Sequence, residues 1–185
     1  GHGISRIPSY VSRIKKGVIR LDRPKVVREG KSTAVIDGNF AIGQIVAQEG
    51  MNLAIEKARE HGVGIVCLRR AGHVGRLADY VELAAKAGMA GMAAVSVGSG
   101  NIASYGGMEP VSGTNPMAYG FPPKNGQHFI LDFATAAMSM GELQKKVSRG
   151  ESLPDGVMRD GYGNPTREFK TFVGPPKGVV LPFGG

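Results

Sequence analysis

Apolar residues recur along the chain in two patterns, one typical of helices and one typical of strands. Over residues 41–61 they return every three or four positions, which predicts an amphipathic helix that ends at Gly62. The short apolar run 63–68 is of the buried-strand type, and helical spacing returns over 76–87. A second strand is predicted over 90–97. This alternation predicts an α/β fold in which helices cover a sheet.

The remaining stretches give weaker signals. Residues 7–16 can form a short basic helix, and a β-prone run over 33–36 closes with the turn dipeptide Asp37-Gly38. A broken β-prone region covers 110–121, and a polar amphipathic segment covers 138–149. From Gly150 onward proline and glycine recur with little periodicity, so we expect an irregular tail.

Composition limits the class of protein. Apolar residues make up 42%, enough for a core, and 29 glycines with 11 prolines indicate many turns. No apolar run is long enough to span a bilayer and no signal-peptide pattern opens the chain, so we expect a cytoplasmic protein without a membrane partner. The single cysteine, Cys67, excludes an internal disulfide, and we expect it to be a small buried hydrophobe. Four scattered histidines without metal-ligand spacing argue against zinc.

The net charge of +8 is concentrated at one end of the chain. Residues 1–31 carry nine Lys or Arg against two acids, so the rest of the chain is nearly neutral. Aromatic residues do not interleave with these basic ones, and no nucleic-acid motif is present. We therefore expect a solvated basic surface that attracts an anionic substrate or cofactor, and no nucleic-acid partner.

One histidine stands at the predicted join of strand and helix. His73 lies between Gly72 and Gly75, in a loop of the kind where α/β sheets place ligand-binding groups. The two glycines allow a tight turn and the close approach of a ligand. From this loop alone, two interpretations stay open: a catalytic histidine, or one that caps a turn and is satisfied by backbone.

Other polar positions are candidates of the same ambiguous kind. Thr114 and Asn115 form a polar turn, and Asp132 is an acid at a strand end that can either bind a histidine or cap a turn. Arg6 stands four residues after His2, and its guanidinium can make two parallel hydrogen bonds to a carboxylate.

A glycine pattern at 98–103 matches the dinucleotide-binding fingerprint in form. Tyr105-Gly106-Gly107 breaks the helix that should follow, and no ribose-binding carboxylate ends a second strand. We therefore reject a Rossmann site, although the loop that starts at Gly98 can still contact a ligand.

Taken together, six ordered motifs resemble the malate/L-lactate dehydrogenase family, over residues 2 to about 168. The motifs are Gly1 to Arg6, Asp37-Gly38 with Gly43-Gln44, Gly72 to Arg76, Gly106-Gly107 with Gly113 to Pro116, Leu131 to Thr135, and Leu153-Pro154 with Gly163 to Thr166. This is the non-Rossmann group that includes ureidoglycolate and sulfolactate dehydrogenases and piperideine-2-carboxylate reductase. The resemblance implies a three-layer α/β sandwich with a mixed, largely antiparallel sheet, of the sulfolactate-dehydrogenase type.

The same resemblance implies a homodimer that transfers hydride between NAD or NADP and a small 2-oxo or 2-hydroxy acid of the malate or lactate type. By position, His73 or His2 resembles the proton-transfer group, and Arg6 resembles the carboxylate clamp. The acid that pairs with His2 in similar enzymes matches Asp132. The further positions implied are Thr114 and Asn115 for substrate, and Asp132, Phe133, Ala134 and Gly98 for cofactor.

Some positions depart from the family pattern. Gly1 stands where serine is usual, Ala136 also replaces a serine, and Glu142 replaces a lysine. The family's N-terminal helices and its long C-terminal region are missing, so we expect a core fragment truncated at both ends. Its expected parts are a basic lead-in from the substrate domain (1–31), an NAD(P)-binding core (32–150) and an irregular tail (151–185). The alternative is a non-catalytic remnant that acts as a dimerising or binding module.

Overall fold

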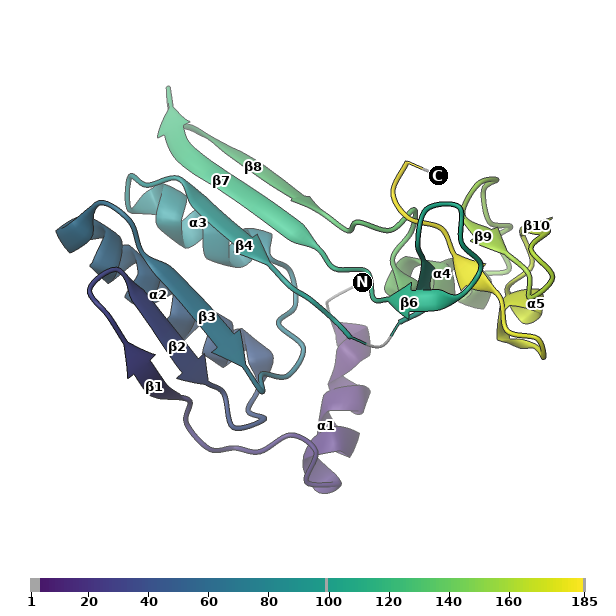
Figure 1. The fold of residues 1–185 in the computed structure, drawn as a ribbon, viewed down its shortest axis with the longest axis horizontal. Coiled ribbons are helices and arrows are strands. Elements are labelled where there is room, and N and C mark those ends of the chain that lie inside the picture. The colour runs from purple at the N-terminus through teal and green to yellow at the C-terminus, as the bar shows by residue number, and fades with distance from the viewer. Residues whose placement is uncertain (1–3, 99, 185) are drawn as a thin grey trace. The chain divides into compact units, whose positions relative to one another are not determined.

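The computed structural model describes residues 4–98 and 100–184 (Figure 1). The helices of these residues are η1 (Ile4–Arg6, a 3-10 turn), α1 (Ile7–Lys15), α2 (Gly43–His61), α3 (Ala78–Lys86), α4 (Met140–Ser148) and α5 (Phe169–Val173). The strands are β1 (Lys25–Glu29), β2 (Thr33–Asp37), β3 (Ile65–Arg69), β4 (Gly91–Ala94), β5 (Ile102–Ala103), β6 (Pro110–Ser112), β7 (Met117–Lys124), β8 (Gln127–Phe133), β9 (Met158–Arg159), β10 (Pro165–Thr166) and β11 (Val179–Val180). The chain divides into two compact units. The larger holds residues up to 93 with 118–132, and the smaller holds 94–117 with residues from 133 onward.

In the larger unit, β1, β2 and β3 form one sheet with β2 in the centre. β1 runs antiparallel to β2, and β3 runs parallel to it, with Asp37 paired to Arg69 at the end of the register. Because β2 and β3 are parallel, their carboxyl ends lie at the same edge of the sheet. The loops that leave the two strands therefore start side by side.

Helix α2 connects β2 to β3 and packs across them (Figure 1). Its fully buried Val46 joins Ile36 and the partly buried Leu68 in one apolar cluster. Gly62 ends the helix with a φ of +80°, a left-handed conformation that glycine adopts without a Cβ penalty.

A second sheet, in the order β4, β7, β8, packs against α3 through glycines. A Cβ on Gly91 would lie 2.6 Å from the Cβ of Ala84, and one on Gly120 would lie 2.6 Å from the carbonyl oxygen of Val81. Only residues without a side chain allow helix and strands to approach this closely.

Side chains of β3 alternate between a covered and an open face. Val66 and Leu68 pack against α2, whereas Ile65 and Cys67 are exposed. The expectation that Cys67 is buried is therefore wrong. An apolar run indicates burial on both faces, but α2 covers only one of them.

The smaller unit contains a five-stranded sheet in the order β10, β9, β11, β5, β6. β11 pairs parallel to β5, and the other neighbouring strands of this sheet pair antiparallel. Its core includes the fully buried Leu143, Met158, Phe172 and Val180. These come from segments far apart in sequence, so this core forms only when the whole unit folds.

The two helices predicted from apolar spacing are present as α2 and α3, the possible short basic helix is α1, and the polar amphipathic segment forms α4, all with ends within two residues of expectation. The chain after Gly150 holds more regular structure than its pattern indicates, because short strands and α5 use it to build the smaller unit. The predicted three-part domain division stays a prediction. Among the described helices, none combines the length and the apolar character needed to cross a bilayer.

Candidate functional site around His73

His73 lies in the loop between β3 and α3, as the strand-to-helix pattern predicts. The side chain is half-buried. Two unusual backbone positions shape the loop: Arg70 has a φ of +50° and Gly75 has a φ of +77°. A non-glycine residue with positive φ is uncommon and persists only where its surroundings hold it.

Three backbone hydrogen bonds fasten this loop to the one that follows β2. The amides of Gly38, Phe40 and Gly72 donate to the carbonyl oxygens of Arg69, Arg70 and Ala41, at 2.9, 2.6 and 3.1 Å. The two loops thus form one layer at the carboxyl edge of the sheet.

The first residue of α2 touches the same loop. A Cβ on Gly43 would lie 2.1 Å from the carbonyl oxygen of Gly72 and 2.6 Å from the carbonyl carbon of His73. No other residue type fits without moving backbone. The N-terminus of α2 therefore packs directly against the backbone of the histidine loop.

A buried carboxylate holds the base of the loop. Asp37 is 4% exposed and accepts hydrogen bonds from Arg70 Nη2 at 2.6 Å and from Arg69 Nε at 3.0 Å. The backbone amide of Asn39 donates to it at 2.9 Å. Hydrogen bonding to Arg70, helped by Asn39, lowers the pKa of Asp37 to about 2. Arg70 is thus held at both its side chain, by Asp37, and its backbone carbonyl oxygen, by the amide of Phe40.

Tyr10 of α1 contacts the imidazole of His73. The Tyr10 Oη to His73 Nδ1 distance is 2.8 Å, and Gln44 Nε2 donates to the same hydroxyl at 2.9 Å. The three side chains come from α1, the first turn of α2 and the loop after β3. They form one hydrogen-bonded row.

Tyr80 holds the loop beyond His73, because its hydroxyl donates a short hydrogen bond to the carbonyl oxygen of Val74. Burial, with smaller contributions from the charges of Asp79 and Tyr10, raises the pKa of Tyr80 to about 12. The hydroxyl therefore stays protonated and keeps donating at neutral pH.

Asp132 lies near the end of β8 and reaches the beginning of α3. Its Oδ2 accepts a hydrogen bond from the backbone amide of Ala78 at 2.8 Å. An unpaired amide and the positive end of the helix dipole both favour a carboxylate there. Of the two roles expected for Asp132, the structure contains a capping contact, made to a helix far away in sequence.

Arg6 ends η1 and immediately precedes α1. Its backbone is helical, and it is four residues from Tyr10, a spacing that places two side chains on the same side of a helix. His2 lies outside the described residues, so its role is still an expectation.

The other predicted positions gather in the smaller unit. The amide of Val97, beside Gly98, donates to Asn115 Oδ1 at 2.8 Å. Thr135 Oγ1 lies 3.1 Å from the carbonyl oxygen of Thr114 and 3.0 Å from that of Asn115. Three loops that are separate in sequence are thus held together by their own polar groups.

Phe133 and Ala134 stand directly before this cluster. Phe133 is the last residue of β8, and its ring centroid lies 6.1 Å from that of Phe183. Ala134 follows and is half-buried. Their predicted cofactor contacts stay a prediction.

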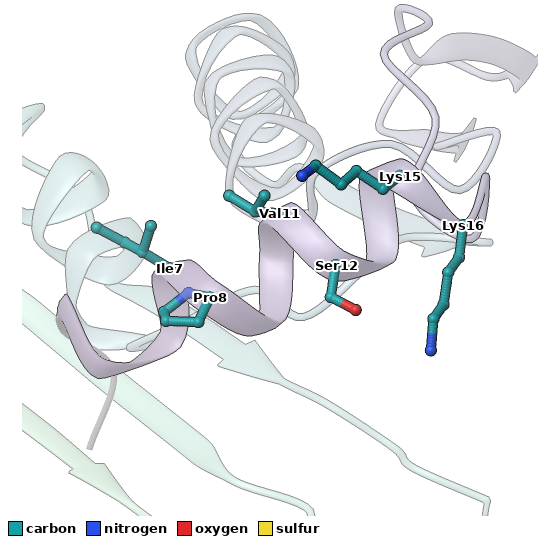
Figure 2. A pocket seen from close by; sticks show the side chains of 6 residues that line it. All are labelled: Ile7, Pro8, Val11, Ser12, Lys15 and Lys16. Atoms are coloured by element: carbon teal, nitrogen blue, oxygen red, sulfur yellow. The ribbon is translucent and has the colours of Figure 1, made fainter.

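A shallow hollow runs along α1, lined by Ile7, Pro8, Val11, Ser12, Lys15 and Lys16 (Figure 2). Figure 2 shows Ile7, Val11 and Lys15 following one another along one side of the helix. The lining contains none of the predicted site residues, so we assign it no part in the site. Within the described ranges, no group of three His, Cys, Asp or Glu side chains is arranged to hold a metal ion.

Sequence reasoning missed Tyr10 and Gln44. Signals for both were present: Tyr10 stands one helical turn after Arg6, and Gln44 belongs to one of the six motifs. Neither signal identifies His73 as the partner, because α1 and α2 are brought to the loop only by the fold.

Comparisons with known proteins bear on this arrangement. The chain is 40% identical over 185 residues to L-sulfolactate dehydrogenase of Methanothermobacter thermautotrophicus, covering 100% of this chain and 53% of that protein. Malate dehydrogenase of Entamoeba histolytica has a similar structure, with a TM-score of 0.94 at 34% identity, over 100% of this chain and 52% of that one. Sulfolactate dehydrogenase of Methanocaldococcus jannaschii gives a TM-score of 0.86 at 39% identity, over 100% and 52%.

The chain spans about half the length of the curated relatives that it matches. The structural matches confirm the expected mixed α/β fold of the sulfolactate-dehydrogenase type. The sequence model of the malate/L-lactate dehydrogenase family matches residues 1–185. The whole chain therefore belongs to the malate/L-lactate dehydrogenase family.

Proposed function

We propose that this chain carries the proton-transfer and carboxylate-binding part of an NAD(P)-dependent oxidoreductase for small 2-oxo and 2-hydroxy acids. The observation that carries the proposal is the His73 loop. It is fastened by backbone hydrogen bonds, closed by Gly43, and its imidazole bonds to Tyr10 at 2.8 Å. Relatives bearing the names malate and sulfolactate dehydrogenase support this class of substrate.

In the proposed reaction, His73 exchanges a proton with the substrate oxygen. An imidazole suits this role because it can carry or release a proton near neutral pH. Arg6 binds the substrate carboxylate, since a guanidinium offers two parallel donors to the two oxygens. His2 is the second candidate for the proton-transfer role, and Thr114 and Asn115 are proposed to contact substrate.

A bound nicotinamide cofactor, NAD or NADP, would supply or accept the hydride. We propose that Gly98, Asp132, Phe133 and Ala134 help to hold it. One observation fits such a contact: a Cβ on Gly98 would meet no atom of the described residues within 4 Å, so on that side its backbone is open to approach by a ligand. Asp132 already binds α3 through Oδ2, which leaves Oδ1 as the atom better placed for a ligand.

The proposal is tested by titrating the chain with NADH and with NADPH and following nucleotide fluorescence. Saturable binding supports the oxidoreductase, and a preference for one nucleotide identifies the cofactor. His73→Gln should keep nucleotide binding, because it preserves the bulk of the side chain. It should lose most reduction of 2-oxo acids, because an amide cannot exchange a proton with the substrate as an imidazole can. Unchanged turnover in His73→Gln would refute the role of His73.

The second candidate is a non-catalytic remnant that dimerises or binds a partner. A remnant predicts no saturable binding of either nucleotide. Sedimentation of the same sample measures the proposed homodimer: a dimer with no nucleotide binding would favour the remnant.

A further inference from the structure

We propose that Tyr10, itself held by Gln44, is a positioning residue that fixes the imidazole of His73 with its proton on Nε2. The inference concerns the same histidine as the proposed function, and the catalytic role of Tyr10 rests on that function. It stands on the row of hydrogen bonds from Gln44 Nε2 to Tyr10 Oη (2.9 Å) and from Tyr10 Oη to His73 Nδ1 (2.8 Å).

The direction of the bonds follows from the chemistry of each group. The amide nitrogen of Gln44 can only donate, so the Tyr10 oxygen accepts from it. The phenolic hydrogen lies in the plane of the ring, at one of two positions beside the oxygen. Because Gln44 approaches this oxygen as a donor, the hydroxyl hydrogen must point away from Gln44, and we infer that it points to His73. Nδ1 is then the acceptor, and a neutral imidazole must carry its proton on Nε2.

The surroundings of the amide support this direction. Gln44 Oε1 is buried and has no hydrogen-bond partner among the described residues. With the amide reversed, Oε1 would accept from Tyr10, and the NH2 group would take the unpartnered place. The observed orientation leaves one carbonyl oxygen and one N–H of the amide without a partner, whereas the reversed orientation leaves two N–H groups without acceptors. The reversed orientation costs more, because a buried N–H without a partner is tolerated less well than a buried carbonyl oxygen without one. The orientation that makes Tyr10 a donor to His73 is therefore favoured.

Each of the two residues that hold the imidazole belongs to a helix. Tyr10 lies on α1, and Gln44 lies in the first turn of α2, directly after the glycine that touches the histidine loop. Because Gln44 donates to the hydroxyl, it polarises the O–H bond and strengthens the bond to Nδ1. A neutral imidazole held this way presents Nε2–H as a hydrogen-bond donor to the oxygen that gains negative charge when a 2-oxo acid is reduced. When Nε2 gives its proton to that oxygen, Nδ1 takes the proton of the Tyr10 hydroxyl, so the imidazole stays neutral and the negative charge moves to the Tyr10 oxygen.

Nitrogen NMR of the chain labelled with 15N-histidine tests the assignment without any need for activity. The His73 resonances are identified by their loss in His73→Gln. At a pH where the imidazole is neutral, we expect an unprotonated, hydrogen-bonded Nδ1 and a protonated Nε2. In Tyr10→Phe, which removes only the hydroxyl, the Nδ1 resonance should move toward that of a nitrogen without a hydrogen bond, and the proton should spread over both nitrogens.

Two further variants separate this effect from general disturbance of the loop. Gln44→Met keeps the length of the side chain and removes the donor to Tyr10, so it should shift Nδ1 in the same direction by a smaller amount. Tyr80→Phe is the matched control, because it also removes a hydroxyl that binds the loop but touches Val74 instead of the imidazole. It should leave the tautomer of His73 unchanged.

A protonated Nδ1 in the wild-type chain would overturn the proposal, and so would an Nδ1 resonance that is the same in Tyr10→Phe and wild type. If the resonances move as expected while no 2-oxo acid is reduced, the positioning role stands and the proposed function fails. If the chain is active, Tyr10→Phe should lower kcat on the order of 10-fold with little change in KM.

Discussion

Replacing Gly43 with alanine tests whether the N-terminus of α2 fixes the histidine loop. The new Cβ would lie 2.1 Å from the carbonyl oxygen of Gly72, whereas ordinary contact begins near 3.4 Å. The backbone around Gly72 and His73 would have to retreat by about 1.3 Å, or α2 would have to move by the same amount. Neither can occur without straining the bond of Gly72 to Ala41.

Two opposing effects set the size of the change. Alanine favours a helix over glycine by up to about 1 kcal/mol, and by less in the first turn. Forcing extra volume into packed structure costs about 1–3 kcal/mol, and the upper end applies because the obstacle is backbone. We therefore expect Gly43→Ala to lower the free energy of unfolding by about 2 kcal/mol. For a chain of this size, that corresponds to a melting temperature lower by about 4–8 °C.

Gly50→Ala is the matched control in the same helix. Its Cβ would lie 2.7 Å from Leu68 Cδ2, the end of a side chain that can rotate away. We expect the helix propensity of alanine to offset the contact, so that the free energy of unfolding stays within about 0.5 kcal/mol of wild type. Urea denaturation followed by circular dichroism measures both variants. A Gly43→Ala chain as stable as wild type, or no more affected than Gly50→Ala, would refute the reasoning.

Three further predictions concern other parts of the fold. Because the pKa of Asp37 is lowered from 3.8 to about 2 in the folded chain, its stabilisation is present above about pH 4 and is lost as pH falls toward 2. Asp37→Asn should therefore lower the urea midpoint at neutral pH and flatten its fall in acid; an equal acid slope in both chains would contradict this. Asp132→Ala should cost about 1 kcal/mol by uncapping α3, with Asp132→Asn retaining most of the stability, as measured by urea denaturation. An Asp132→Ala chain as stable as wild type would show that the cap contributes nothing. Leu143→Ala, at a fully buried position, should cost about 2–5 kcal/mol, and a loss below about 1 kcal/mol would mean that the smaller unit does not unfold with the measured transition.

Local signals in the sequence were sufficient for the regular elements of the larger unit. The helical spacing before Gly62 and the apolar run of β3 depend on neighbours a few positions apart, and these patterns are visible in the chain itself. They also place His73 correctly, between a strand and a helix. Cys67 shows the limit: the same apolar run could not reveal that only one face of β3 is covered.

The smaller unit shows the same limit more strongly. Its sheet pairs β11 with β5, strands that are far apart in the sequence, and each strand is only two residues long. Such short segments carry no periodic signal. Their structure comes from pairing and from burial around residues such as Phe172, which are properties of the folded unit.

By itself, the sequence determined the family resemblance and the position of His73 on a glycine-bounded loop. Tertiary structure decided what surrounds that histidine: Tyr10 and Gln44 reach it from two helices, and Asp132 reaches the start of α3 from a distant strand. The physical reason is one of range. Helix and strand propensities act over a few residues, whereas a hydrogen-bonded site is assembled from side chains that only packing brings within 3 Å of one another.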